Sequence, residues 1–282
     1  MRQVIPATLI ALILVATPAA VLAQDTTRTS RDSLIPDSRL FHRSDLYVLA
    51  GFVGATVAMV PLDRRLAESV RRDHLVENST LNAIEETLNF AGGPGPILAG
   101  GALYVFGRVA DKPRLAHVAL HVTEAMAAGL AASGALKMLA GRARPYASAD
   151  TAPYDFGFGR GFEGERFQAF PSGHATVSFA AAAALVSETT ELSARTRWIA
   201  GSLLFGSATL VGLSRMYADR HWASDVVVGA AIGTFAGLKT VRFNHTRTGN
   251  RVDRWLLGET ATVMRLLPGA RGSALLVVDV RY

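Results

Sequence analysis

The chain has 282 residues, of which 50% are hydrophobic and 18% charged, and its formal net charge is +6. This balance indicates one large helical domain, and the absence of cysteine excludes disulfides, thiolate metal sites and a cysteine nucleophile. The basic residues are scattered between apolar segments, so we expect no nucleic-acid partner; the positive charge suits anionic lipid or a phosphorylated substrate.

The N-terminal region predicts export. Arg2 precedes an apolar stretch, and small residues precede a cleavage point at Gln24. We therefore expect a signal peptide over residues 1–23; the alternative is an uncleaved anchor, which the short apolar core disfavours. Residues 24–45 are polar and predict an extended leader.

Apolar segments separated by charged or Gly/Pro-rich breaks predict an all-α domain over residues 46–240. Six helices are expected, over Leu46–Val60, Ile97–Phe106, Leu115–Leu139, His174–Ser187, Arg197–Leu213 and His221–Leu238. Between the first two, apolar residues recur at helical spacing among charges. This pattern predicts an amphipathic helix over Arg64–Asn89, along the bundle or at an interface.

The tail over residues 241–282 differs from the rest. Thr260–Leu267 and Ser273–Val280 flank a turn rich in proline and glycine. This pattern suggests a short C-terminal β-hairpin.

Whether the helices span a membrane stays open at this point. A span needs about 20 mostly apolar residues, whereas Leu46–Val60 and His174–Ser187 are short and Leu115–Leu139 contains polar residues. Either one segment does not span, or the domain is periplasmic and attached to a membrane. With export, we expect a cell-envelope protein, membrane-associated or periplasmic, whose active site lies outside the cytoplasm.

Three polar clusters occupy two of the connections between helices. They read Lys137-Met-Leu-Ala-Gly-Arg-Ala-Arg144-Pro145, Pro171-Ser172-Gly173-His174 and Ser214-Arg215-Met-Tyr-Ala-Asp-Arg-His221-Trp-Ala-Ser-Asp225. If the last four helices form an antiparallel bundle, all three clusters lie at the same end of it. Lys137, Arg144 and Arg215 would then repel one another without an anion between them. The clusters therefore predict an oxyanion ligand, most economically phosphate.

The second cluster opens a helix. Ser172 is placed to cap it, and Gly173 lets the backbone approach a ligand, so the free N–H groups of the helix N-terminus add to the anion site. His174 is then a candidate proton donor. The alternative is a helix cap with a polar histidine and no ligand.

The third cluster predicts a nucleophile. His221 and Asp225 are four residues apart, so on a helix they share a face and the carboxylate can orient the imidazole. The other ring nitrogen can then attack phosphorus to form a phosphohistidine, while His174 protonates the leaving oxygen and later activates water. This scheme requires no metal and no cofactor. The alternative is an ordinary His–Asp surface pair.

These clusters resemble the signature of the type 2 phosphatidic acid phosphatase (PAP2) superfamily, which includes class A acid phosphatases and vanadium haloperoxidases. The signature reads K-x6-R-P, P-S-G-H and S-R-x5-H-x3-D, and the resemblance covers about residues 115–238. It implies a six-helix-type antiparallel bundle, with catalysis by His221, His174 and Asp225. It further implies a phosphate-binding set of Lys137, Arg144, Ser172, Gly173 and Arg215.

The function expected from these features is a metal-independent phosphatase acting on phosphomonoesters or pyrophosphates. Lipid phosphates, such as phosphatidic acid or isoprenyl pyrophosphate, are the preferred substrates because the helices are apolar. The alternatives are an acid phosphatase for soluble esters, a vanadium-dependent haloperoxidase and a non-catalytic lipid-binding bundle. Vanadate would be a cofactor for the haloperoxidase and an inhibitor otherwise.

Other polar and aromatic residues have less specific interpretations. His117, His121 and Glu124 share a helical face and could ligate a metal, but packing behind the site is the preferred interpretation. Arg142 and Arg220 adjoin signature positions, and we interpret them as solvated rather than as lining the entrance. The loop Tyr154–Phe162 forms either an aromatic rim or a packed loop, and Trp222 either shields His221 or belongs to the core.

Overall fold

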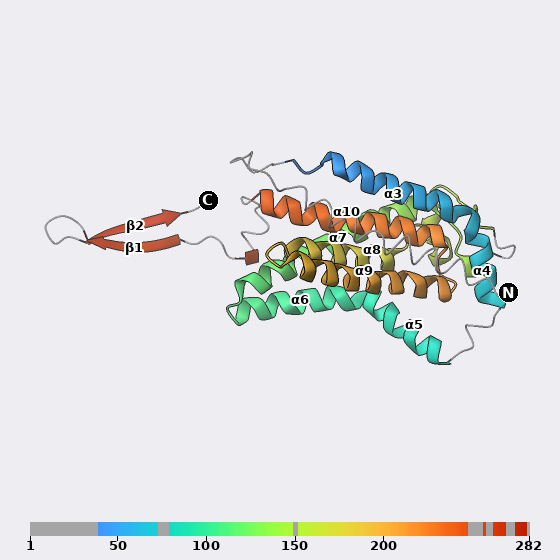
Figure 1. Ribbon diagram of the computed structural model, residues 1–282, viewed down its shortest axis with the longest axis horizontal. Helices are drawn as coiled ribbons and strands as arrows, with labels where there is room; N and C mark the ends of the chain where they lie inside the picture. The colour runs from blue at the N-terminus through green and yellow to red at the C-terminus, as the bar shows by residue number, and fades with distance from the viewer. Residues whose placement is uncertain are drawn as a thin grey trace.

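The computed structural model describes residues 39–72, 79–148, 152–247 and 256–257, together with the backbone of 262–268 and 274–280. The signal peptide predicted over 1–23, and all but the end of the leader predicted over 24–45, lie outside these residues. The described chain is a helical bundle (Figure 1), which confirms the all-α prediction.

The bundle helices follow one another with short connections. In chain order they are α3 (Arg43–Met59), α4 (Asp63–Arg72), α5 (Ser79–Gly92), α6 (Pro94–Val109), α7 (Pro113–Ala140), α8 (Gly173–Glu188), α9 (Ala194–Tyr217) and α10 (Ala223–Thr246). Single 3-10 turns occur at Val60–Leu62, Pro145–Ala147, Arg160–Glu163 and Glu165–Phe167.

Helix α8 is the centre of the bundle. It packs against α7, α9 and α10, and most of its side chains are buried (Figure 1). Its sequence GHATVSFAAAAALVSE consists mainly of small residues, which lets neighbouring helices approach on several sides. A helix that is apolar all round is typical of a buried position.

A row of glycines on α10 sets the closest of these contacts. A Cβ atom built on Gly229, Gly233 or Gly237 would lie 2.2–2.6 Å from a backbone oxygen of the α8 segment, for example 2.2 Å from that of Thr176 at Gly233. No side chain fits at such distances. The backbones of α8 and α10 therefore touch at three points, one on each of three successive turns of α10.

This arrangement places the predicted site at one end of the bundle. Helices α7 and α9 end there, whereas α8 and α10 begin there, so α8 and α10 run parallel and each is antiparallel to α9. The first turns of α8 and α10 are joined directly, because the Ser172 N–H donates to the carbonyl oxygen of Asp225 at 3.0 Å.

Two of the predicted elements are wrong in detail. The amphipathic segment Arg64–Asn89 contains two helices, α4 and α5, rather than one. Helix α10 begins at Ala223 and not at His221, because Trp222 is extended and its N–H donates to the Asp225 carboxylate at 2.8 Å, which caps the helix.

The described chain contains four segments long and apolar enough to cross a membrane. They are Arg43–Arg71, Pro113–Ala147, Ala194–Tyr217 and Ala223–Thr246. The first is longer than expected because a 3-10 turn continues α3 into α4. Large apolar side chains are exposed along the outside of the bundle, among them Tyr47, Val57, Leu103, Phe106, Val109 and Leu203. These features fit association with a membrane.

Beyond the helices, strands β1 (Thr262–Pro268) and β2 (Ala274–Val280) pair antiparallel in a hairpin. It lies where the sequence suggests one.

The contact between α8 and α10 can be tested with a matched pair of glycine variants. Gly233→Ala should lower the melting temperature in detergent, because the new methyl group overpacks the contact at a cost of about 1–3 kcal/mol. Gly206→Ala on α9 is the control, since a Cβ there meets nothing within 4 Å. Equal melting temperatures for the two variants would contradict the close contact.

Candidate active site

A cavity of about 560 Å³ opens at the end of the bundle where α8 and α10 begin. Its walls come from the ends of α5 to α9 and from the loops that follow α7 and α9. Six predicted site residues line it: Lys137, Arg144, Gly173, His174, Arg215 and His221. The other two, Ser172 and Asp225, are fully buried behind them.

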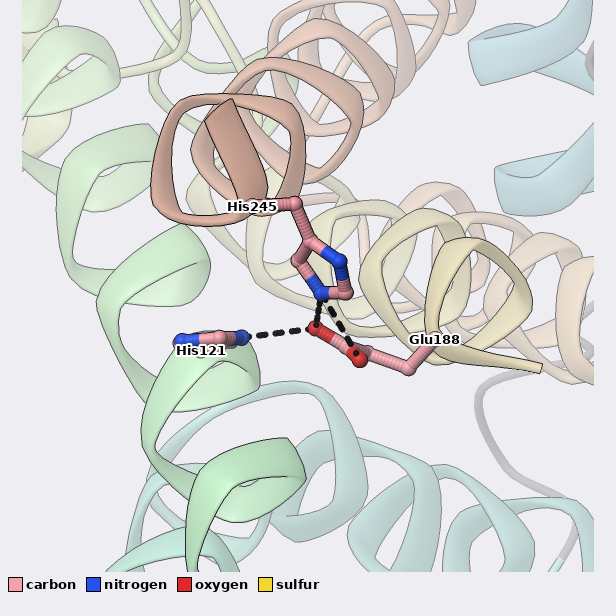
Figure 2. A group of neighbouring side chains, drawn as sticks. All are labelled: His121, Glu188 and His245. Carbon is pink, nitrogen blue, oxygen red and sulfur yellow. Dashed lines mark hydrogen bonds and ion pairs between the residues drawn. The ribbon is translucent and has the colours of Figure 1, made fainter. Parts of the chain in front are cut away.

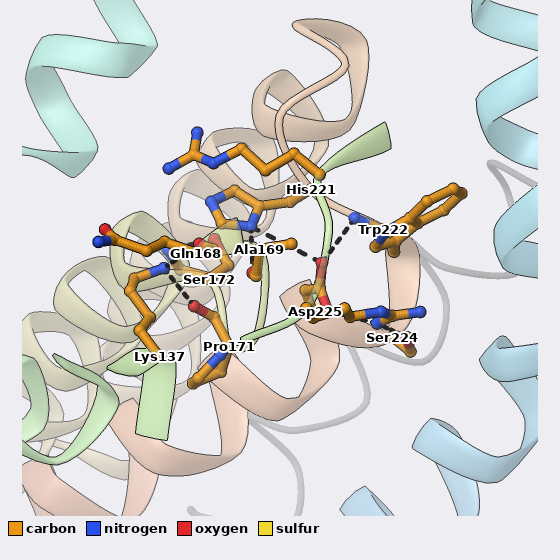
Figure 3. Close-up of polar contacts among 12 residues, drawn as sticks. Lys137, Gln168, Ala169, Pro171, Ser172, His221, Trp222, Ser224 and Asp225 are labelled. Carbon is orange, nitrogen blue, oxygen red and sulfur yellow. Dashed lines mark hydrogen bonds and ion pairs between the residues drawn. The ribbon is translucent and has the colours of Figure 1, made fainter. Parts of the chain in front are cut away.

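The imidazole of His221 is buried and held in one orientation. Its Nδ1 lies 2.6 Å from the carbonyl oxygen of Ala169 (Figure 3). Because a carbonyl oxygen only accepts, Nδ1 carries the ring proton and Nε2 keeps its lone pair. The ring therefore has the tautomer that a nucleophile attacking through Nε2 requires.

Asp225 does not orient this ring in the way the sequence predicts. Its Oδ2 lies 3.8 Å from Nδ1 of His221, too far for a hydrogen bond, and accepts from the backbone N–H of Trp222 instead. His221 precedes α10, so the two residues are not on one helical face. The carboxylate still lies close enough to stabilise a positive charge on the ring.

Arg142 is the partner of Asp225, and its prediction as a solvated arginine is wrong. Its guanidinium is buried and bonds to Oδ1 of Asp225, to Oδ2 of Asp63 at 2.8 Å and to Oγ of Ser224 at 2.8 Å. It also donates to the carbonyl oxygen of Pro153. One arginine therefore fixes two buried carboxylates beneath the nucleophile.

Trp222 belongs to the core. It is 1% exposed, and its Nε1 donates to the carbonyl oxygen of Ala143 at 2.9 Å. Its ring lies 5.4 Å from the guanidinium carbon of Arg142, which adds a cation–π contact to the buried network.

Lys137 links two walls of the cavity. Its Nζ donates to the carbonyl oxygens of Gln168 at 3.0 Å and Pro171 at 2.6 Å (Figure 3). The α7 helix that carries it ends at Gly141, whose left-handed φ of 54° turns the chain toward Arg142 and Arg144. A Cβ at Gly141 would lie 2.0 Å from the carbonyl oxygen of Gly157.

The cavity arginines are partly neutralised by the protein itself. Arg144 and Arg220 both bond to Glu165, at 3.3 Å and 3.0 Å, and Arg215 bonds to Glu85 at 2.6 Å. The sequence predicts that these cations repel one another unless an anion lies between them. The ion pairs show that protein carboxylates already relieve part of this repulsion. Four cations still face two carboxylates, so the cavity keeps an excess of positive charge.

Both Arg144 and Arg215 retain unused donors. The Nε atoms of these two guanidinium groups are buried, and neither has a hydrogen-bond partner among the residues the structure describes. Arg215 is further oriented by Asn89, whose side-chain oxygen accepts at 2.6 Å. Buried donors of this kind favour an anionic ligand.

The N-terminus of α8 opens onto the same cavity. Ser172 Oγ accepts from the N–H of Ala175 at 3.5 Å, which confirms the predicted cap. A Cβ at Gly173 would meet only Lys137 Cε, at 3.6 Å. The helix therefore presents its positive end to the cavity.

The pKa of both cavity histidines is lowered, which favours the neutral imidazole. Burial, aided by the cations of Arg215, Lys137 and Arg144, lowers the pKa of His174 to about 4. Burial and the nearby cations also hold the pKa of His221 well below its usual value.

The remaining candidates are distributed around the bundle. His117, His121 and Glu124, considered as a possible metal site, do not form one cluster. Glu124 accepts from Asn244 at 2.6 Å, and His117 Nδ1 lies 3.0 Å from the carbonyl oxygen of Pro113. Arg220 lines the cavity entrance, a role the sequence left as the less favoured alternative.

The loop between the first two clusters exposes several aromatic side chains. Tyr154, Phe158 and Phe162 are 66%, 91% and 73% exposed. The loop is therefore not fully packed, but none of these three side chains lines the cavity.

Comparisons with known proteins agree with the geometry. The model of the PAP2 superfamily matches residues 118–249. Over 77 residues the chain is 38% identical to a lipid A 1-phosphatase of Porphyromonas gingivalis, a match that covers 27% of this chain and only 16% of that protein. No solved structure gives a significant match. All eight predicted site residues lie within this match, so over residues 118–249 the chain is similar to the PAP2 superfamily.

Proposed function

We propose that this protein is a membrane-associated phosphatase of the cell envelope that hydrolyses lipid phosphomonoesters or pyrophosphates through a phosphohistidine on His221. One observation carries the proposal. A buried imidazole, with Nδ1 held by Ala169 and Nε2 unprotonated, lines a cavity together with a second histidine and several cations.

Phosphate binding uses the groups that face the cavity. Arg144, Arg215 and Lys137 bind the non-bridging oxygens, together with the N–H groups at the start of α8. As negative charge shifts onto these oxygens in the transition state, the fixed cations stabilise it. Side chains thereby supply the charge stabilisation for which other phosphatases use a metal, so we propose that turnover needs no metal and no cofactor.

In the first step, Nε2 of His221 attacks phosphorus and the bond from phosphorus to the ester oxygen breaks. The departing oxygen takes a proton from His174, and the phosphoryl group remains on His221. The phosphorylated ring is cationic. The carbonyl of Ala169 and the carboxylate of Asp225, 3.8 Å away, stabilise it.

In the second step, His174 accepts a proton from a water molecule whose oxygen attacks phosphorus. The bond from Nε2 to phosphorus breaks and its electron pair returns to Nε2 of His221. Inorganic phosphate then leaves the cavity. His174 then releases this proton, because its low pKa favours the neutral ring in the free protein.

Three features favour a lipid substrate. Apolar residues form one wall of the cavity: Pro94, Ile97, Leu130 and Val177. The outside of the bundle is apolar, and four segments are able to span a membrane. The relative from Porphyromonas gingivalis is named for a lipid phosphate. A phosphate head at the cations and an acyl chain along the apolar wall satisfy both halves of the cavity.

A substrate panel tests this assignment. The full chain in detergent, treated with EDTA, should release phosphate from phosphatidic acid and from an isoprenyl pyrophosphate with a higher kcat/KM than from p-nitrophenyl phosphate. Vanadate should inhibit each reaction by occupying the cation site. Faster turnover of the soluble ester would favour the acid phosphatase alternative, and halide oxidation dependent on vanadate would favour the haloperoxidase.

The two histidines should separate in their effects. His221→Ala should lower kcat at least about 1,000-fold and abolish an alkali-stable phosphoenzyme, because no nucleophile remains. His174→Ala should slow phosphoenzyme formation by about 100- to 10,000-fold from phosphatidic acid but far less from p-nitrophenyl phosphate, whose leaving group needs no proton. His117→Ala, a histidine outside the cavity, is the control. A phosphoenzyme in His221→Ala would exclude the mechanism.

The low pKa of His174 predicts an acidic optimum. With a pKa of about 4, His174 is unprotonated in most of the free protein at higher pH. The proton that His174 donates to the leaving group must therefore arrive on the substrate monoanion. The second pKa of a phosphomonoester is about 6, so kcat/KM should fall roughly tenfold per pH unit above it. The test is to measure kcat/KM for a phosphomonoester from about pH 5 to about pH 8. A flat profile over that range would contradict a proton carried in by substrate.

Arg142 should behave as a positioning residue. Arg142→Lys keeps the charge but loses donors to Asp225 and Asp63, so phosphoenzyme formation should slow at least about tenfold with KM unchanged. Arg160→Lys is the matched control, because Arg160 bonds to Asp155 and the carbonyl oxygen of Gly141 in the neighbouring loop. If both variants form phosphoenzyme at the wild-type rate when folded, Arg142 does not act on the nucleophile.

A further inference from the structure

Three side chains from three helices meet at the end of the bundle opposite the active site. Figure 2 shows His121 of α7 and His245 of α10 directed at the carboxylate of Glu188, the last residue of α8. Glu188 is 67 positions from His121 and 57 from His245 in sequence, so only the packing of α7, α8 and α10 brings the three together.

The geometry suits a single cation. Oε1 of Glu188 lies 2.7 Å from Nδ1 of His121 and 3.0 Å from Nε2 of His245, and one ligand atom from each residue lies within 4.8 Å of the others. Zinc is bound at about 2.0–2.2 Å by imidazole nitrogen and carboxylate oxygen, so its ligand atoms are about 3–4 Å apart. Small rotations of the three side chains would open their present contacts to that spacing.

The surroundings provide both rigidity and access. The side chains of His121 and Glu188 are only 7% and 8% exposed, whereas that of His245 is 54% exposed. Two ligands are therefore fixed by the core, and the third closes the site from the solvent side. Water can supply a fourth ligand on the open face.

Electrostatics at this end also favour a cation. Glu188 ends α8, and His245 lies in the last turn of α10. The carbonyl groups at a helix C-terminus carry negative partial charge, and two such ends converge here. Two imidazoles and one carboxylate select zinc or a related first-row divalent ion rather than calcium or magnesium, which prefer oxygen ligands.

We propose that His121, Glu188 and His245 form a structural site for zinc or a similar divalent transition metal, which ties together the far ends of α7, α8 and α10. Glu188 is 14 residues from His174 along α8, about 21 Å at the helical rise, so this metal takes no part in the chemistry. Its effect is on stability, since it binds only the folded arrangement of the three helices.

Zinc titration of the full chain tests this site. The protein, purified in detergent without a polyhistidine tag and stripped with EDTA, should bind one zinc ion per chain by calorimetry. His245→Ala and Glu188→Gln should each weaken binding at least about tenfold. Saturating zinc should raise the melting temperature of the wild-type chain by several degrees and leave that of His245→Ala unchanged.

His117→Ala is the matched control, because His117 lies one turn from His121 on α7 but outside the three-residue group. It should bind zinc as the wild type does. Absence of stoichiometric zinc in the wild-type chain, or wild-type affinity in both His245→Ala and Glu188→Gln, would overturn the proposal. Phosphate release should be the same with and without zinc, so this result is independent of the proposed phosphatase activity.

Discussion

The direct backbone contact between α8 and α10 is the constraint on which the active site depends. It exists because Gly229, Gly233 and Gly237 present no side chain to α8. The two helices run parallel and touch from their first turns, where Ser172 donates to the carbonyl oxygen of Asp225. His174 lies in the first turn of α8 and His221 precedes the first turn of α10, so the same contact brings both imidazoles to one cavity.

Two helix N-termini therefore meet at this end, and their positive ends are neutralised to different degrees. The start of α10 is neutralised internally: Asp225 accepts from Trp222, and Asp63 accepts from the backbone of Ser224 at 2.9 Å. Arg142 balances these two buried carboxylates, without which their desolvation would be costly. The start of α8 carries only the Ser172 cap, so its positive end remains directed at the cavity.

Much of this site could be predicted from the sequence, because most of its cations and both its histidines lie in short local clusters. Lys137, Arg144, His174 and His221 line the cavity as their spacing predicts. Apolar segments and apolar residues at helical spacing also identified the bundle helices, although not the division between α4 and α5.

What sequence reasoning missed depends on tertiary partners. Arg142 was interpreted as solvated because its carboxylate partners, Asp63 and Asp225, lie 79 and 83 positions away in sequence. The hydrogen bond from His221 to Ala169 joins a side chain to a carbonyl group, and a carbonyl group has no sequence signature. Likewise, helical spacing grouped His121 with His117 and Glu124, whereas its partners come from α8 and α10.

The carboxylates in the cavity explain how so many cations can share it in the folded protein. Glu165 is 64% exposed and bonds to both Arg144 and Arg220, whereas Glu85 is largely buried and holds Arg215. An exposed carboxylate binds an arginine weakly, since water competes for both groups. In the proposed mechanism, a phosphate dianion carries more charge than Glu165 and offers several acceptor oxygens to the same donors, so it would displace Glu165 while Arg215 stays positioned by Glu85. The cations are thus held near their binding geometry before the ligand arrives, which is the condition for fixed charges to lower a reaction barrier.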